Sequence, residues 1–333
     1  MTSLRAGRRT NVALLWLLLA AIGTGMVAYA VGTTPTAFVI AVAHGAAGLG
    51  VVLLVPWKSV VVRRAARRAS RGRWVVGVLL GVLAALAVAG GTVFALTGYR
   101  PVLGVTALAV HVGAGLALLP LLSAHAWRRR QRLRRVDVSR RNLLRTAGFV
   151  VGGAAAYGVL DVTALALNGR VRATGSHQVG SGDPDRMPVT QWFTDGVPAL
   201  DFDTWQVSVG GRWVSYAELS AGTDVVRATI DCTGGWYAEQ EWRGVRLERL
   251  VPAADIRSID VVSATGYRRR LPARDATSLL LATHAAGAPL SAGHGGPVRL
   301  VAPGRRGFWW VKWVQRVEAS REPWWLQSPF PWQ

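Results

Sequence analysis

Nearly charge-free apolar runs, each long enough to cross a membrane as a helix, fill the first half of this 333-residue chain. Each run is 22 to 25 residues long. At about 1.5 Å per helical residue, that length spans the roughly 30 Å of hydrocarbon in a bilayer. The sequence therefore predicts an all-α bundle of five transmembrane helices, over residues 11–33, 36–57, 74–97, 101–125 and 146–167.

Basic residues are concentrated in short clusters between these runs. Residues 1–170 contain 21 Lys and Arg but only two acids, Asp137 and Asp161, whereas residues 171–333 hold 18 basic and 16 acidic residues. Because Lys and Arg next to membrane lipid favour the cytoplasmic side, we expect a multi-pass plasma-membrane protein with a cytoplasmic N-terminus and an extracytoplasmic C-terminal domain. Nucleic acid is not expected as a partner, because these charges do not share a folded, soluble surface.

A signal for export lies at the end of the third basic cluster. The stretch "SRRNLLRTAGFVVGGAAAYGVL", which begins at Ser139, resembles a twin-arginine signal. That route carries folded domains, so it predicts that the exported domain receives a cofactor in the cytoplasm. The resulting organisation is a four-helix anchor over 1–126, a basic loop with the signal and the fifth helix over 127–168, and an exported domain over 169–333.

The second and fourth apolar runs share the pattern H-x-x-A-G-L, around His44 and His111. The run before each contains a Gly-Thr step, at 23–24 and 91–92, which indicates a duplicated two-helix unit. Both histidines lie at matching depth near the outer face, so they can ligate the iron of a haem b. The pattern resembles membrane cytochrome b anchors. The alternative is a pair of polar side chains that hydrogen-bond between helices without haem.

The part after about residue 170 has the size of a single domain. Apolar alternation predicts a strand-rich α+β class. Short helices are expected from the capping-box spacing of Ser215 and Glu218 and over 276–286. The predicted strands cover 205–211, 225–231, 258–266, 297–304 and 309–320.

Cys232 is the only cysteine of the chain and follows directly on a predicted strand, at "CTGGW". A lone thiol outside the cell cannot form a disulfide within its own chain. It can be a small buried apolar residue. It can equally supply a soft thiolate ligand to a heavy metal.

Two ordered blocks resemble the molybdopterin-binding domain of the sulfite oxidase family. They are "DCTGGWYAEQEWRGVRLERLV", around Cys232, and "APLSAGHGGPVRLVAPGRRGFWWVKWVQRVE", over 288–318. The resemblance implies a pterin-bound molybdenum whose protein ligand, and central catalytic residue, is Cys232. It also implies that His294, Arg299 and Lys312 bind the pterin and its phosphate, and Arg suits phosphate because it donates two parallel hydrogen bonds.

Further cofactor contacts are implied at Ser176 and His177, within "ATGSHQVGSG". Arg305 and Arg306 are expected in a solvated turn instead. The arginine-rich substrate pocket of sulfite oxidases has no counterpart in the "TGGW" after Cys232, so the resemblance does not extend to sulfite as the substrate.

The sequence thus predicts a membrane-anchored molybdenum-cofactor oxidoreductase that acts on a small molecule. Its outward-facing domain would exchange electrons with a haem b, a quinone or a redox protein. One alternative is a haem-free anchored molybdoenzyme with a separate electron partner. The other is a non-enzymatic exported binding module in which Cys232 only packs.

Overall fold

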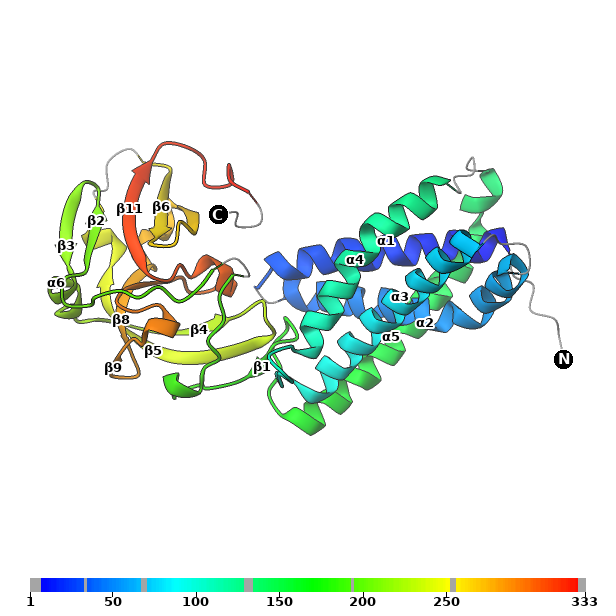
Figure 1. Ribbon diagram of the computed structural model, residues 1–333, viewed down its shortest axis with the longest axis horizontal. Helices are drawn as coiled ribbons and strands as arrows, with labels where there is room; N and C mark the ends of the chain where they lie inside the picture. The colour runs from blue at the N-terminus through cyan, green and yellow to red at the C-terminus, as the bar shows by residue number, and fades with distance from the viewer. Residues whose placement is uncertain are drawn as a thin grey trace. The chain divides into compact units, whose positions relative to one another are not determined.

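The computed structural model divides into two compact units, Met1–His177 and Gln178–Gln333. The first unit is helical and the second is built mainly from strands (Figure 1). The central part of the third basic cluster, 129–133, lies outside the described residues. The structure describes residues 7–32, 35–66, 71–128, 134–192, 195–251 and 256–328.

Five long helices make up the first unit, one for each predicted apolar run. Each of them extends into a neighbouring basic cluster: the second helix, for example, continues to Ala66, and the fifth begins at Arg140. Arginine and alanine are strong helix formers, so the charged flanks continue the apolar helices. The helices are α1 (Arg8–Ala30), α2 (Thr36–Ala66), α3 (Arg71–Thr97), α4 (Ala107–Arg128) and α5 (Arg140–Asn168).

Apolar side chains cover the outside of the helical unit. Val151, Val159 and Val162 of α5 are 69%, 70% and 68% exposed, and Leu116 of α4 is 61% exposed. An apolar exterior of this extent is unusual for a surface that faces water. All five helices are long and apolar enough to cross a membrane, so they are candidate membrane spans.

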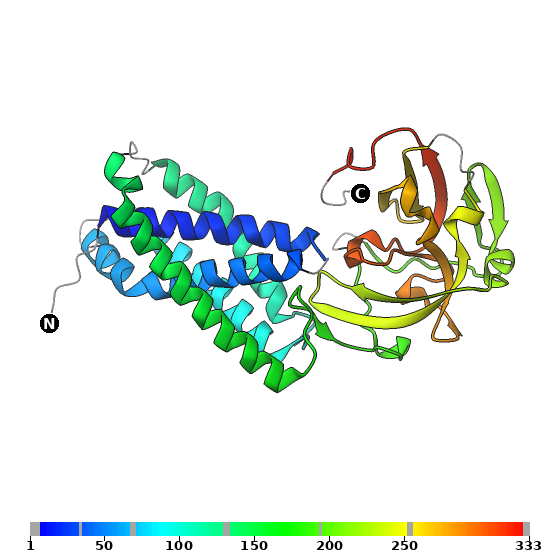
Figure 2. The same cartoon turned by 180° about the vertical axis from the view of Figure 1, so that it is seen from behind.

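Small residues allow α5 to approach α2 closely. A Cβ on Gly153 would overlap the carbonyl oxygen of Ala46, and a Cβ on Gly45 would overlap the ring of Tyr157. Close backbone approach through glycine is typical of helices that pack without a hydrophobic driving force. Figure 2 shows α5, in green, running beside α1 and α2.

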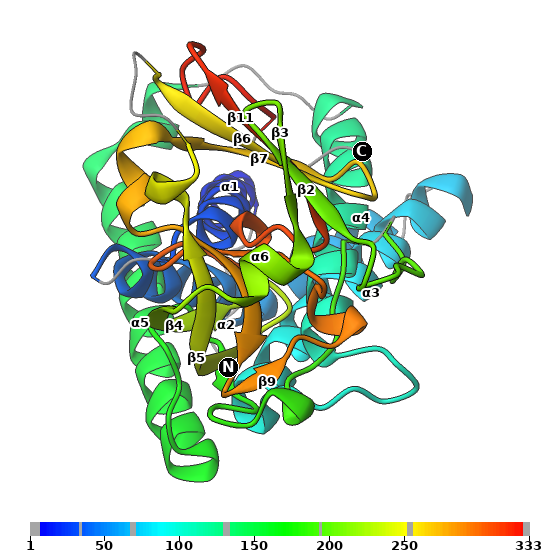
Figure 3. The same ribbon diagram turned by 90° about the vertical axis from the view of Figure 1, so that its left-hand side faces the viewer.

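Two sheets form the second unit, and Figure 3 shows β2, β3, β6, β7 and β11 apart from β4, β5 and β9. One sheet has the order β3-β2-β11-β6-β7, in which only the β11–β2 pair is parallel. In the other, β5 pairs with β4 and β8, and β8 pairs with β10 and β9. The short β1 (His177–Gln178) spans the boundary between the units. The remaining strands are β2 (Gln206–Val209), β3 (Arg212–Ser215), β4 (Asp224–Asp231), β5 (Trp236–Arg246), β6 (Ser258–Ser263), β7 (Arg268–Pro272), β8 (Leu280–Ala285), β9 (Ala288–Pro289), β10 (Arg299–Val301) and β11 (Val314–Ser320).

The helix predicted over 276–286 is wrong. A 3-10 turn, Ala273–Thr277, leads there into β8, and every residue of β8 is buried. A strand covered on both faces loses the alternation that marks half-buried strands, so its sequence cannot be told from a buried helix by periodicity. The other predicted helix is confirmed, as α6 (Tyr216–Ser220), with the capping box between Ser215 and Glu218.

A glycine fixes the register between β5 and β8. The pairing shifts between Arg243 and Gly244, and a Cβ on Gly244 would overlap the carbonyl oxygen of Leu281. Trp242, just before this irregularity, is fully buried and donates from its indole to the carbonyl of Ala228 at 3.1 Å. Trp242 of β5 thus packs in the core directly beside this irregularity.

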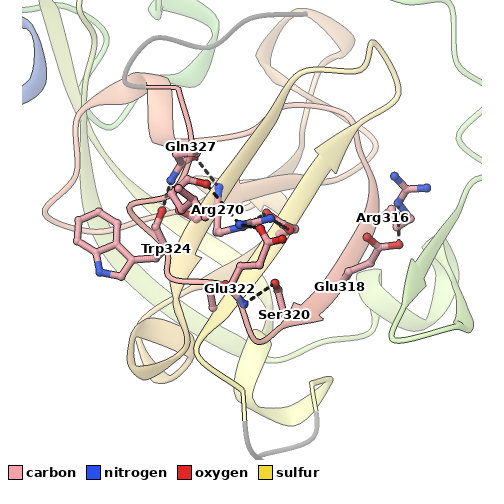
Figure 4. A network of polar contacts seen from close by, with 10 residues as sticks. Arg270, Arg316, Glu318, Ser320, Glu322, Trp324 and Gln327 are labelled. Carbon is pink, nitrogen blue, oxygen red and sulfur yellow. Dashed lines mark hydrogen bonds and ion pairs between the residues drawn. The ribbon is translucent and has the colours of Figure 1, made fainter.

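Arg270 in β7 shows how this unit pairs a buried cation with acids. Its guanidinium donates to both carboxylate oxygens of Asp260, at 2.9 and 2.8 Å, and contacts Glu322. Hydrogen bonds with Asp260 raise the pKa of Arg270. Figure 4 shows Glu322 and Gln327 on either side of the Arg270 side chain. The charge of this buried arginine is thus compensated within the protein.

Candidate functional site

Cys232 lies in the tight turn between β4 and β5, at the strand end that the sequence predicts. Its N–H donates to the carbonyl of Trp236 at 2.9 Å, and Gly235 completes the turn with a φ of 92°. Two groups approach the sulfur: the backbone nitrogen of Gly234 at 3.3 Å and the hydroxyl of Thr190 at 3.4 Å. The half-buried thiol is therefore held by its backbone and has polar neighbours.

An ion pair supports the residue before the cysteine. Arg306 is 5% exposed and donates to the carboxylate of Asp231 at 2.5 Å. Its other terminal nitrogen lies 3.5 Å from the carbonyl oxygen of Cys232. The prediction that Arg306 lies in a solvated turn is wrong, because this pair draws the turn after β10 onto the end of β4. Arg305 is only partly buried and pairs with Asp275.

Arg299, at the start of β10, is buried without a carboxylate partner among the described residues. It is 2% exposed, and one terminal nitrogen donates to the carbonyl of His294 at 2.8 Å. Its guanidinium carbon lies 5.1 Å and 5.7 Å from the ring centres of Trp242 and Trp310. Within that part of the chain its Nε has no hydrogen-bond acceptor. Burial lowers the pKa of Arg299 to about 10, and the nearby Cys232 opposes this shift.

Lys312 contributes a second cation close to Arg299 and Cys232. Its ammonium donates to the carbonyls of Thr190 at 2.9 Å and Gly293 at 2.6 Å. Burial, with the neighbouring Arg299, lowers the pKa of Lys312 to about 7, while Cys232 and Asp195 act in the opposite direction. This half-buried cation forms no salt bridge among the described residues, so carbonyl dipoles and the charge of Asp195 compensate it only in part. Arg299 and Lys312 thus make a site that favours a bound anion.

His294 organises the loop that precedes Arg299. Its Nε2 donates to the carbonyl of Met187 at 3.0 Å, so Nδ1 accepts from the hydroxyl of Ser291 at 2.8 Å. Burial and the nearby cations lower the pKa of His294. Both ring nitrogens are thus engaged with the protein. The next residue, Gly295, has a φ of 102°, and a Cβ there would lie 2.9 Å from the Lys312 side chain.

These residues fit a cofactor that has an anionic end and a metal. Arg299 and Lys312 suit a phosphate, and Cys232 offers a soft ligand beside them. The indole nitrogen of Trp236, 3% exposed, has no acceptor among the described residues and leaves a further donor. That part of the chain contains no cluster of three or more His, Cys, Asp or Glu. A metal bound at Cys232 would therefore take most of its ligands from the cofactor.

Ser176 and His177 are the last residues of the first unit, and His177 begins β1, which pairs with β5. The His177 ring lies edge-on to Phe94 of α3, with 5.2 Å between ring centres. A Cβ on Gly98 would lie 3.0 Å from this ring. Burial lowers the pKa of His177. The backbone carbonyl of Ser176 accepts from Arg172 at 2.9 Å. Both residues are buried, His177 lies against the end of α3, and the role of the two toward a cofactor stays a prediction.

His44 of α2 and His111 of α4 meet inside the helical unit. Their ring centres are 5.7 Å apart and the ring planes are nearly perpendicular, at 89°. Nδ1 of His44 lies 2.9 Å from the carbonyl oxygen of Ala21, and Nδ1 of His111 lies 2.6 Å from that of Ala87. A carbonyl can only accept, so each Nδ1 donates and each Nε2 keeps its lone pair. Metal-ligating histidines are typically oriented by such a bond.

The contacts of these histidines revise the alignment of the two-helix repeat. A Cβ on Gly25 would lie 3.0 Å from the His44 ring, and a Cβ on Gly91 would lie 2.8 Å from the His111 ring. Gly23, which the Gly-Thr steps align with Gly91, has nothing within 4 Å. The equivalent glycines are therefore Gly25 and Gly91, each four residues after the carbonyl that binds the histidine.

Sequence reasoning missed Thr190 and Trp236 at the cysteine. Thr190 lies 42 residues before Cys232, in a segment without regular secondary structure. No motif singles out such a threonine. Trp236 belongs to the same short block as Cys232, and its position four residues after the thiol, across a glycine turn, could have suggested that the two are close.

The match to a protein family concerns the second unit. Residues 194–327 match the family described as the oxidoreductase molybdopterin binding domain. A nitrate reductase (NAD(P)H) of Hordeum vulgare is 27% identical over 202 aligned residues, which cover 44% of this chain and only 23% of that relative. The sulfane dehydrogenase SoxCD from Paracoccus pantotrophus is 22% identical, with a TM-score of 0.36 over 38% of this chain and 41% of that chain. Residues 194–327, which include Cys232, Arg299 and Lys312, are therefore similar to the molybdopterin-binding domain of oxidoreductases.

Proposed function

We propose that the chain is a membrane-anchored molybdenum-cofactor oxidoreductase with an outward-facing catalytic domain that exchanges electrons with a haem b or a quinone in the membrane part. One observation carries the proposal. The thiol of Cys232 lies near two cations, the buried Arg299 and the half-buried Lys312, and neither forms a salt bridge with a carboxylate among the described residues. Such an arrangement favours an anionic ligand, and the thiol beside it can bind a metal.

Each residue of this site has a separate task. Cys232 provides the thiolate that holds the metal, and the N–H of Gly234 donates to that sulfur. Arg299 and Lys312 bind the phosphate of the pterin. His294 takes part through its fixed loop, because its backbone carbonyl orients Arg299. When bound, the molybdenum–pterin group supplies oxygen-atom transfer or two-electron redox chemistry to a small substrate.

In the helical unit we propose that His44 and His111 hold a haem b. Support comes from their facing rings and from the carbonyls of Ala21 and Ala87, which leave both Nε2 atoms able to bind iron. Gly25 and Gly91 let each ring pack against the neighbouring helix, because a Cβ at either position would crowd the ring. Such a haem supplies one-electron transfer to a quinone or redox protein.

The orientation follows from charge and from the export signal. We propose that residues 1–126 form the anchor in the lipid of the plasma membrane, that 127–168 contain the cytoplasmic basic loop and the fifth span, and that 169–333 are exported. Arg140 and Arg141, the twin arginines, begin α5, directly before the last span. Export of a folded domain fits a cofactor that is inserted before translocation.

The proposal is tested on full-length protein purified in detergent from cells with an intact twin-arginine pathway. Elemental and pterin analysis should find molybdenum and molybdopterin in equimolar amounts with the chain, and the optical spectrum should show a Soret band. Protein without molybdenum would contradict the catalytic assignment. Protein with molybdenum but without a Soret band would support the haem-free alternative, in which a separate partner exchanges the electrons.

A further inference from the structure

A short segment before the matched family region contacts Cys232. The residues from Met187 to Thr190 lie outside the 194–327 match and have mostly irregular structure. They nevertheless contact the loop that contains His294, and they also contact Lys312. Their position is thus determined by the candidate cofactor site itself.

Three independent contacts fix this segment. The carbonyl of Met187 accepts from His294 Nε2 at 3.0 Å. Val189 lies against Gly293, where an added Cβ would come within 2.9 Å of its methyl group. The carbonyl of Thr190 accepts from the ammonium of Lys312 at 2.9 Å. None of these contacts involves Cys232, so the place of Thr190 does not depend on the thiol.

The Thr190 side chain is directed toward the sulfur. Its hydroxyl oxygen lies 3.4 Å from Sγ of Cys232, within the range of hydrogen bonds to sulfur. When Cys232 is a free thiol, either its S–H or the hydroxyl of Thr190 can donate. A metal-bound thiolate has no proton, so in the loaded protein only the hydroxyl of Thr190 can donate.

We propose that Thr190 is a positioning residue that donates a hydrogen bond to the metal-binding thiolate of Cys232 while its carbonyl holds Lys312. This inference rests on the proposed function, because it concerns the sulfur as a molybdenum ligand. One residue then links the cation of the phosphate site with the ligand of the metal. Hydrogen bonds to ligating sulfurs withdraw electron density and favour the reduced metal, so they raise its reduction potential.

The test compares Thr190→Val with Thr190→Ser in the full-length, detergent-purified holoenzyme. Valine keeps the shape and the backbone carbonyl for Lys312 but removes the hydroxyl, whereas serine keeps the hydroxyl. Thr223→Val, at an exposed position between α6 and β4, is the matched control. The readouts are molybdenum and pterin content, the sulfur-to-molybdenum charge-transfer absorption, and the midpoint potential of the bound molybdenum followed by EPR.

Thr190→Val should lower the midpoint potential and move the charge-transfer band to longer wavelength, while Thr190→Ser and Thr223→Val stay close to the wild type. Loss of molybdenum from Thr190→Val but not from Thr190→Ser would support the same role. An unchanged potential and band in fully loaded Thr190→Val would overturn the inference, as would Thr190→Ser behaving like the valine variant. Wild-type protein without molybdenum would instead refute the proposed function.

Discussion

The helical and the strand-rich units differ in where their large apolar side chains lie. In the helical unit, large apolar residues such as Val159 and Leu116 face outward. In the strand-rich unit, apolar residues fill the core and four arginines are buried with them: Arg269, Arg270, Arg299 and Arg306. The apolar exterior of the first unit fits the proposed lipid environment. The buried arginines of the second unit need other groups that compensate their charge. The exposed apolar residues of the first unit thus suit lipid, and a buried cation without a carboxylate partner in the second suits an anionic ligand.

The four buried arginines of the described residues sharpen this contrast, because two of them pair with carboxylates within the protein. Arg270 pairs with Asp260, and Arg306 pairs with Asp231. Arg269 lies over the ring of Trp309, 4.3 Å from its centre. Arg299 also has aromatic neighbours and donates to a backbone carbonyl, and unlike Arg270 and Arg306 it has no carboxylate partner among the described residues. The difference distinguishes structural arginines from one that awaits a ligand.

The largest effect is expected from changes at Cys232. Cys232→Ser and Cys232→Ala should lower turnover by more than about 100-fold, beyond the range typical of residues that only support a metal ligand. Turnover can be followed with an artificial electron carrier and a panel of sulfoxides, nitrate and sulfite. The Soret band of the helical unit should remain. Normal turnover in either variant would contradict the role of the thiolate.

Substitutions of the two histidines in the helical unit are expected to remove the haem and to leave the molybdenum in place. His44→Ala and His111→Ala should each abolish the Soret band, because haem iron would lose an axial ligand, and should leave the molybdenum content unchanged. His125→Ala, in the same helix as His111, is the control and should keep the band. A normal haem spectrum in either of the first two variants would exclude the bis-histidine site. Joint loss of haem and molybdenum would show that the two units do not assemble independently.

Two arginine substitutions test the difference between compensated and uncompensated charge. Arg299→Met should lower molybdenum and pterin content by roughly 10- to 100-fold, since a hydrogen bond to a charged group contributes about 1.5–3 kcal/mol. The thermal stability of the cofactor-free protein should hardly change. Arg270→Met should leave Asp260 buried and unpaired and lower the free energy of unfolding by about 3–5 kcal/mol. Equal destabilisation by both substitutions, measured by denaturant unfolding, would remove the distinction.

The smallest effect is a pH dependence that arises from Lys312. Its pKa is lowered to about 7, and the ordinary value is 10.5. Between these values the unfolded chain binds more protons, so the free energy of unfolding of the cofactor-free protein should rise with pH. An anionic cofactor restores the charge on Lys312, so its binding takes up a proton and should weaken by up to about tenfold per pH unit above 7.

Retention of molybdenum and pterin after dialysis at pH 7 to 9 measures this effect. Lys312→Met should bind the cofactor weakly at every pH and show a flatter profile. The chain's other lysine provides the control, because Lys58→Met lies in α2 and should keep the wild-type dependence. A wild-type profile without slope would mean that Lys312 stays charged in the empty site.

Much of the fold follows from local sequence patterns, and the site follows only in part. The five helices, the α6 capping box at Ser215 and the place of Cys232 at a strand end depend on local periodicity and turn residues. β8 was not predictable in this way, because burial on both faces removes alternation from Leu280–Ala285. The roles of Thr190 and Arg306 depend on contacts with residues 42 and 75 positions away, so no local pattern encodes them.

X-ray absorption at the molybdenum edge tests the central claim most directly, because it counts the sulfur atoms bound to the metal. The wild-type holoenzyme should show one more molybdenum–sulfur bond than Cys232→Ser, at equal pterin content. The same number of sulfur ligands in both proteins would contradict the claim that Cys232 holds the metal.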